Sequence, residues 1–150
     1  MNEGQRTKPV IVVADDEAHI RLVVADRFKS AGYEVIQAAD GEEALEAVQT
    51  HLPDVVVTDL QMPYMSGLEL CTRLAMNPRT AGIPAVMLTA RGPIVEPETI
   101  GKTIIRTVMA KPFGVKELVR VVEELIGAGH KTRTGDAVRL TLPGSASEAA

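Results

Sequence analysis

The sequence predicts an α/β domain built on a doubly wound, five-stranded parallel sheet with helices on both faces. Short apolar runs rich in valine and isoleucine alternate with segments whose apolar residues recur at helical spacing. The connections between these segments are short, as they are in α/β units. Strands that alternate with helices form parallel sheets, because each right-handed crossover returns the chain to the same end of the sheet. These observations favour one compact domain.

Each element has its own signal in the sequence. The expected strands are the apolar runs at residues 10–14, 33–38, 55–59, 85–89 and 107–110. The expected regular helices lie at residues 18–32, 41–49, 68–76 and 114–126. Asp40 and Glu43 predict the start of the second helix, because they stand at the two positions of a reciprocal cap. Gly32 closes the first helix, where a left-handed residue is favoured.

The segment between the fourth and fifth expected strands departs from this regular pattern. Proline is tolerated in the first turn of a helix and costs about 3 kcal/mol deeper inside it. Pro97 therefore predicts a short, atypical fourth helix that runs to about Ile105. The pairs Ile94-Val95 and Ile104-Ile105 either pack in the core or form a partner-binding patch, and core packing is the favoured interpretation.

Composition and charge limit the functional classes. The chain has 150 residues, 45% apolar and 24% charged, which is enough for one domain with its own core. A net charge of -4 gives no electrostatic reason to expect direct binding to nucleic acid or to an anionic membrane. No apolar run approaches the roughly 20 residues of a membrane span, so we expect a cytoplasmic protein. The single cysteine, Cys71, lies in a helical apolar run and is expected in the core.

The two ends of the chain differ from its centre. We place the domain at residues 9–127, after a flexible N-terminus of residues 1–8. Residues 128–150 are rich in small and polar side chains, which predicts a flexible tail or a truncated linker. Val138, Leu140 and Leu142 alternate as in a marginal strand that would pair with a sheet edge or a partner, but flexibility is the favoured interpretation.

Polar side chains stand at the ends of four expected strands. Asp15 and Asp16 follow the first strand, Asp59 ends the third, Thr89 ends the fourth and Lys111 follows the fifth. All carboxyl ends of a parallel sheet lie at one edge, where open α/β sheets bind their ligands. Each residue alone has a structural explanation, such as a helix cap for the aspartates or a solvated charge for the lysine. Their common position favours a functional site.

These residue types suit phosphoryl chemistry with a metal ion. Crowded carboxylates repel one another unless a cation neutralises them, and hard oxygen ligands favour Mg²⁺. A carboxylate such as Asp59 can attack phosphorus and form an acyl phosphate. The ammonium of Lys111 and the hydroxyl of Thr89 can contact phosphoryl oxygens, and the threonine can change rotamer as the site changes.

Several separated motifs carry a resemblance to a known family. They are Val13-Ala14-Asp15-Asp16-Glu17, Val57-Thr58-Asp59-Leu60-Gln61-Met62-Pro63, Met87-Leu88-Thr89-Ala90 and Ala110-Lys111-Pro112-Phe113. In this order they resemble the receiver domain of two-component response regulators, over roughly residues 8–127. The resemblance implies a flavodoxin-like fold and a role in signal transduction.

The resemblance also implies a role for each motif residue. Asp59 is implied to accept a phosphoryl group from a histidine kinase, a phosphotransfer protein or a small acyl phosphate. Lys111, joined to Pro112 by a cis peptide bond, is implied to bind that group, and Thr89 is the implied switch. The implied Mg²⁺ ligands are Asp16, Asp59 and the backbone carbonyl of Gln61, with Asp15 acting through a water molecule.

Further positions are expected to tune the site or its output. Gln61, Ala90 and Arg91 flank the phosphoryl position and are expected to affect the lifetime of the phosphorylated aspartate. Val108 stands where the family usually carries an aromatic side chain that follows the threonine. With the irregular fourth helix, this valine predicts a non-standard signalling surface for an unidentified downstream protein, and a homodimer is possible.

The sequence leaves alternatives to the favoured function open. That function is a stand-alone receiver whose only chemistry is its own phosphotransfer and dephosphorylation. A pseudo-receiver that binds partners without phosphorylation is consistent with Val108, whereas the complete acidic pocket opposes it. A phosphatase of the haloacid dehalogenase type is less favoured, because its nucleophile lies in an Asp-x-Asp motif after the first strand, where Asp15 and Asp16 are adjacent.

Overall fold

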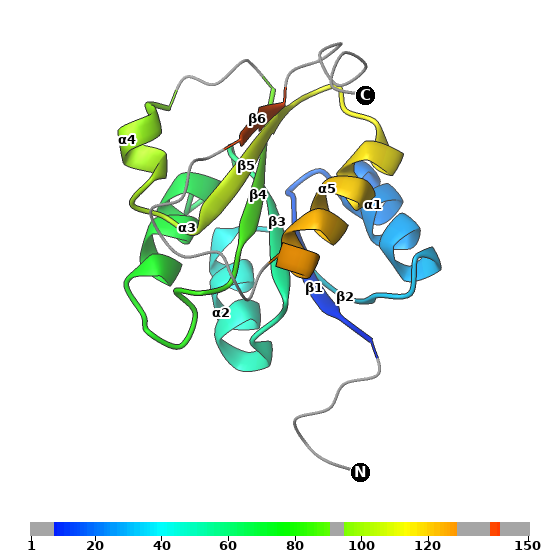
Figure 1. Ribbon diagram of the computed structural model, residues 1–150, viewed down its shortest axis with the longest axis horizontal. Coiled ribbons are helices and arrows are strands. Elements are labelled where there is room, and N and C mark those ends of the chain that lie inside the picture. The colour runs from blue at the N-terminus through cyan, green and yellow to red at the C-terminus, as the bar shows by residue number, and fades with distance from the viewer. Residues whose placement is uncertain (1–7, 91–94, 129–138, 142–150) are drawn as a thin grey trace.

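The computed structural model describes residues 8–90, 95–128 and 139–141. The expectations for residues 1–7, for Arg91 and Ile94 and for most of the tail lie outside these residues. The described residues form one parallel sheet in the order β2-β1-β3-β4-β5-β6 (Figure 1). Its strands are β1 (Val10–Ala14), β2 (Glu34–Ala38), β3 (Val55–Asp59), β4 (Ala85–Thr89), β5 (Ile105–Ala110) and β6 (Arg139–Thr141).

Helices cover both faces of the sheet (Figure 1). One face carries α1 (Ala18–Ser30) and α5 (Val115–Ala128), which share a core with the strands through Phe28 and Leu118. The other face carries α2 (Gly41–His51), α3 (Gly67–Ala75) and α4 (Pro97–Ile100). Cys71 lies fully buried in this second core, as predicted. The structure confirms the doubly wound α/β class.

The central strands are buried on both faces. Every residue of β1, β3 and β4 is buried, which explains why these strands are continuous apolar runs and not alternating ones. The chain builds the sheet outward from β1 in both directions, because β1 pairs with β2 on one side and with β3 on the other. This arrangement opens a crevice at the carboxyl ends of β1 and β3.

Local signals set the ends of the regular helices. Asp40 caps α2 by accepting a hydrogen bond from the Glu43 backbone N–H at 2.8 Å. The Glu43 carboxylate accepts a return bond of 2.8 Å from the N–H of Ala39, one residue before the N-cap, so the predicted cap by Asp40 is present and the return bond is shifted by one residue. Gly32 has a φ of 98°, the left-handed conformation expected after α1.

The fourth helix is shorter than the sequence predicts. α4 begins at Pro97, as expected for a first-turn proline, but it ends at Ile100 instead of near Ile105. Ile105 begins β5, which is longer than predicted. The reason is burial, since Ile104 and Ile105 are both 0% exposed and β-branched side chains pack well in a sheet. The core interpretation of this isoleucine pair is confirmed.

A sixth strand extends the sheet at β5. β6 runs parallel to β5 and places Arg139, Leu140 and Thr141 opposite Thr107, Val108 and Met109. The alternating pattern around Leu140 allowed such a strand, although flexibility was the favoured interpretation of the tail. For these three residues the structure shows the strand. No helix in the described part of the chain is both long and apolar enough to span a membrane.

Candidate functional site

The carboxyl ends of the strands bring the predicted residues to one place. Asp15 and Asp16 follow β1, Asp59 ends β3, Thr89 ends β4 and Lys111 follows β5. An open pocket of about 780 Å³ lies at this edge, and Asp16, Asp59 and Lys111 line it. The convergence predicted from the strand ends is therefore present.

Asp59 is held in place by the turn that follows it. The carboxylate belongs to the last residue of β3, which is 7% exposed. The Leu60 N–H donates to the carbonyl of Leu88 at 2.8 Å, and the Gly67 N–H donates to the carbonyl of Leu60 at 2.7 Å. A side chain at Gly67 would overlap the carbonyl oxygen of Asp59, so the start of α3 packs directly against the end of β3.

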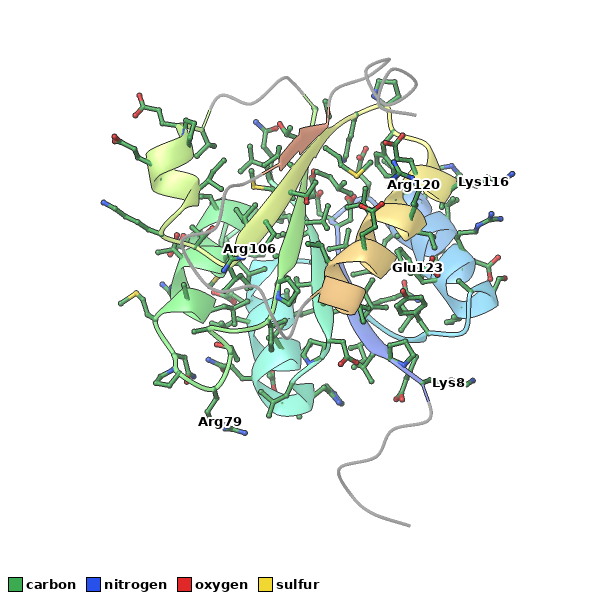
Figure 2. All side chains as sticks on the ribbon, viewed as in Figure 1. Lys8, Arg79, Arg106, Lys116, Arg120 and Glu123 are labelled. Atoms are coloured by element: carbon green, nitrogen blue, oxygen red, sulfur yellow. The ribbon has the colours of Figure 1, made fainter. Side chains whose placement is uncertain are left out.

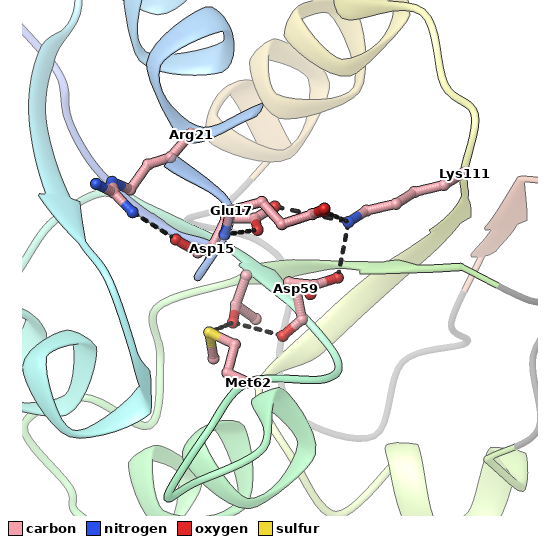
Figure 3. Close-up of polar contacts among 7 residues, drawn as sticks. Asp15, Glu17, Arg21, Asp59, Met62 and Lys111 are labelled. Atoms are coloured by element: carbon pink, nitrogen blue, oxygen red, sulfur yellow. Dashed lines mark hydrogen bonds and ion pairs between the residues drawn. The ribbon is translucent and has the colours of Figure 1, made fainter. Parts of the chain in front are cut away.

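Lys111 is the centre of the charged network in the site. Its Nζ lies 3.1 Å from Oδ1 of Asp59, 3.6 Å from Oδ2 of Asp15 and 3.7 Å from Oε1 of Glu17 (Figure 3). Its backbone N–H donates to the carbonyl of Thr89 at 2.7 Å, which continues the pairing of β4 with β5. The peptide bond to Pro112 is cis, as the resemblance implied.

Asp15 is fixed on three sides. Its N–H donates to the carbonyl of Ala38 at 3.1 Å, and its Oδ1 accepts a bond of 2.9 Å from the Glu17 N–H. Arg21 donates to the Asp15 carbonyl at 2.8 Å (Figure 3). It also donates to Oε1 of Gln37 at 3.2 Å, so it links the end of β1 to β2. The sequence reasoning assigned no role to Glu17 or Arg21. The available signal was their own i, i+4 spacing, which starts directly after the acidic pair.

Burial and charge act in opposite directions on the site. Burial raises the pKa of Asp59 above its ordinary value, although the hydrogen bond and the attraction from Lys111 lower it. Burial likewise raises the pKa of Asp15 against the effects of the Glu17 N–H and Lys111. Burial lowers the pKa of Lys111, but its hydrogen bond to Asp59 and the nearby carboxylates outweigh this and raise it. One ammonium therefore does not compensate the buried carboxylates.

The donor set fits a hard divalent cation. Asp15, Asp16 and Asp59 each offer one carboxylate oxygen, and these three oxygens lie within 4.8 Å of one another. Oδ2 of Asp15 is buried and has no hydrogen-bond partner among the described residues. An all-oxygen set with an open side toward solvent suits Mg²⁺, which keeps part of its water shell. Gln61 lines the same pocket, beside the aspartates.

The remaining predicted residues lie around the pocket in different ways. Gln61 and Ala90 are exposed and line it. Thr89 is 3% exposed and joins Lys111 through the backbone bond. Val108 is 2% exposed and packs in the core on the side of α3 and α4. The predicted role of Arg91 stays untested, because that residue lies outside the described part of the chain.

Comparison with known proteins decides the family. Residues 11–123 match the family model described as the response regulator receiver domain. The chain belongs to this family. The receiver domain is 39% identical over 119 residues to the probable transcriptional regulator ycf27 of Cyanophora paradoxa, an overlap of 79% of this chain and 48% of that protein. It is 35% identical over 118 residues to the phosphate regulon transcriptional regulatory protein PhoB of Rhizobium meliloti (strain 1021), with 79% and 52% covered.

Solved structures agree with this family. A putative response regulator from Chloroflexus aurantiacus superimposes on the receiver domain with a TM-score of 0.74 at 33% identity, covering 81% of this chain and 99% of that one. The chemotaxis response regulator CheY4 of Vibrio cholerae gives a TM-score of 0.70 at 33% identity, with 79% and 99% covered. The receiver domain spans about half the length of the curated relatives it matches.

Proposed function

We propose that this receiver domain accepts a phosphoryl group on Asp59, with Mg²⁺ bound, from a histidine kinase or a phosphotransfer protein. The observation that carries the proposal is the position of Asp59, whose carboxylate lies 3.1 Å from the Lys111 ammonium and within 4.8 Å of the other two aspartates. A nucleophile, a phosphoryl-binding cation and a metal-ligand set thus share one open pocket.

The proposed transfer follows from this arrangement. A carboxylate oxygen of Asp59 forms a bond to phosphorus while the bond from phosphorus to the donor nitrogen breaks, and the donor imidazole leaves with that electron pair. Lys111 lies on the Asp59 side of the pocket, where it attracts a phosphoryl oxygen. Thr89 is the proposed hydroxyl donor to another oxygen. Bound Mg²⁺ supplies the further positive charge that the pocket requires.

We place the phosphodonor on the surface next to Lys111. An apolar groove of about 460 Å³ lies between α1 and the turn after β5, and Ile20, Val23, Pro112 and Phe113 are among its lining residues. Val23 is 45% exposed, which is unusual for a valine in a helix whose other face already packs in the core. A donor helix bound there would hold its phosphohistidine beside the pocket.

The output that we propose is a change in a protein-binding surface. The curated relatives are named as transcriptional regulators, and this chain corresponds to about half of their length. The net charge of -4 supports contact with protein over direct contact with nucleic acid for this chain itself. We propose that its own chemistry is limited to one phosphoryl transfer and its hydrolysis at Asp59.

The first test is phosphoryl uptake measured by intact mass. The wild-type chain, incubated with Mg²⁺ and acetyl phosphate, is expected to gain one phosphoryl group, and Asp59→Asn to gain none. Asp54→Asn is the matched control, because Asp54 also lies beside β3 but at its other end. Equal uptake by the wild type and Asp59→Asn would contradict the assignment of the nucleophile.

The same experiment separates the alternatives. A pseudo-receiver would show no uptake while keeping its native circular dichroism spectrum. A phosphatase would release phosphate continuously from diverse phosphate esters, and would do so many times per chain. Single uptake without such turnover supports the receiver function.

The second test addresses the donor surface. Val23→Asp places a charge in the apolar groove and is expected to slow transfer from a phosphorylated histidine phosphotransfer protein at least about tenfold, a loss typical of a disrupted contact centre. Uptake from acetyl phosphate is expected to stay unchanged, because Val23 does not line the acidic pocket. Met76→Asp is the control, since Met76 is 78% exposed at the distant end of α3. Equal slowing by both variants would rule out the groove.

A further inference from the structure

The outer edge of β5 is closed by a strand from the end of the chain. β5 pairs with β4 on its inner side and with β6 on its outer side (Figure 1). The second pairing covers Thr107, Val108 and Met109. These residues are 1%, 2% and 2% exposed, and among the described residues the three-residue strand β6 lies beyond them in the sheet.

β5 has few of the features that usually protect an edge strand. Its sequence, IRTVMA, contains no lysine, glutamate or proline. Its one charged residue, Arg106, is only 7% exposed and lies at the start of the strand (Figure 2). The Arg106 guanidinium donates to the backbone carbonyls of Thr103 and Ile105, so it is folded back onto the chain. An apolar strand of this kind readily pairs with another strand when its edge is open.

β6 is an addition to the receiver domain proper. It lies beyond residues 11–123, where the family model matches. Three residues are at the short limit for a strand, so few backbone hydrogen bonds hold β6 in place. Because β6 is short and the edge of β5 pairs readily, we expect another strand to be able to displace β6 from that edge.

We propose that the outer edge of β5 is a strand-docking site whose occupant is Arg139–Thr141 of the same chain. Backbone pairing gives this contact its affinity, with Leu140 in register with Val108 at its centre. The docked strand keeps the edge closed to pairing with other chains. Because the contact is made by a short linear segment, the same sequence supplied as a separate peptide competes for the edge.

The first arm of the test opens the edge in the full-length chain. Leu140→Pro removes the backbone N–H at the middle of the three-residue strand and fixes φ near about −65°, away from the range of an extended strand. Amide hydrogen exchange of residues 107–109 is expected to speed up at least about tenfold, as local openings do when their closing contacts are lost. Ser147→Pro, the same change outside β6, is the control and is expected to leave exchange unchanged. Unchanged protection in Leu140→Pro would overturn the proposal.

The second arm supplies the strand in trans. A peptide of residues 136–143, DAVRLTLP, is expected to restore the protection of residues 107–109 in Leu140→Pro and to bind the wild type more weakly, because the wild-type edge is occupied. The same peptide with proline in place of Leu140 is expected to do neither. Failure of the unmodified peptide to restore protection would overturn the docking site, even if the first arm succeeded.

A third arm locks the strand in place. Val108 and Leu140 are partners in the β5–β6 register, so cysteines at both positions are close enough for a disulfide. The native Cys71 is fully buried, and burial raises its thiol pKa to about 12, which keeps it out of the reaction. The oxidised variant is expected to exclude the peptide, and an oxidised variant that binds it normally would contradict the proposal. None of the three arms depends on phosphorylation of Asp59, so failure here and failure of the proposed function are distinguishable.

Discussion

At the scale of single residues, the site is a balance between burial and charge. Asp15, Glu17 and Asp59 surround Lys111, and Asp16 lies beside the other two aspartates, which leaves the negative charge in excess. The raised pKa values of Asp15 and Asp59 follow from this, because burial outweighs the attraction of one ammonium. A site in this state gains from a bound cation, which neutralises part of the negative charge of the carboxylates. The chemistry was predictable from residue types, whereas the hydrogen bond from Arg21 to the Asp15 carbonyl was not, because it depends on where α1 packs.

Tyr33 supplies a prediction of pH dependence far from the site. Its ring is 5% exposed and packs edge-on against Phe28 at 5.0 Å between ring centres. Burial, with smaller contributions from Glu123 and Asp54, raises the phenol pKa from 10.0 to about 12. Between these values the unfolded chain loses the phenol proton while the folded chain keeps it, so stability falls as the pH rises through this window.

Tyr33→Phe is therefore expected to reduce the fall of the unfolding free energy at high pH. Near pH 7 the variant should match the wild type closely, because the phenol is protonated in both states. At pH 11, one unit above the ordinary phenol pKa of 10.0, the wild type should have lost about 1.4 kcal/mol of unfolding free energy that the variant retains. Urea unfolding of both proteins from pH 8 to 11 measures the difference. If the unfolding free energies of the two proteins changed in parallel across that range, the raised pKa of the buried phenol would be contradicted.

At the scale of elements, the sequence predicted where helices begin more accurately than where they end. Caps are local, so Asp40 and Pro97 marked the beginnings of α2 and α4 correctly. The end of α4 depended on a competition between helix and sheet for Ile104 and Ile105. Burial against β4 decided that competition, since Ile105 pairs with Ala85. Local sequence could not show that contact.

The cap of α2 provides a prediction at this scale. Asp40→Ala removes the acceptor of the Glu43 N–H and is expected to lower the unfolding free energy by about 1 kcal/mol. For a domain of this size that change lowers the thermal midpoint by about 4 °C. Thermal unfolding followed by circular dichroism measures it. Glu46→Ala, on the exposed side of the same helix, is the control, and an equal loss there would show that the cap is not the cause.

At the scale of the whole molecule, the fold concentrates charge at one edge of the sheet. Right-handed crossovers place every carboxyl end there, so residues far apart in the chain become neighbours. The phosphoryl chemistry that we propose for Asp59 and the strand docking that we propose for β5 therefore involve one continuous sheet. β5 carries Met109 in register with β6 and leads through Ala110 directly to Lys111.

Mg²⁺ is expected to stabilise the whole domain through this edge. A ligand that binds only the folded state at about ten times its dissociation constant adds about 1.4 kcal/mol to the unfolding free energy. The gain should be smaller in Asp16→Ala, which removes one oxygen donor of the cluster. Thermal unfolding with MgCl₂, compared with NaCl at equal ionic strength, measures the effect. A midpoint that rises equally in both salts would contradict a specific site.

The sequence by itself determined the α/β class, the positions of the five main strands along the chain and the residues at their carboxyl ends, because these depend on local periodicity and on the general handedness of crossovers. Only the tertiary structure decided the length of α4, the roles of Glu17 and Arg21 around the aspartates, and the pairing of β6 with β5. Each of these depends on contacts between segments far apart in the chain, and their free energy is absent from any local window of the sequence.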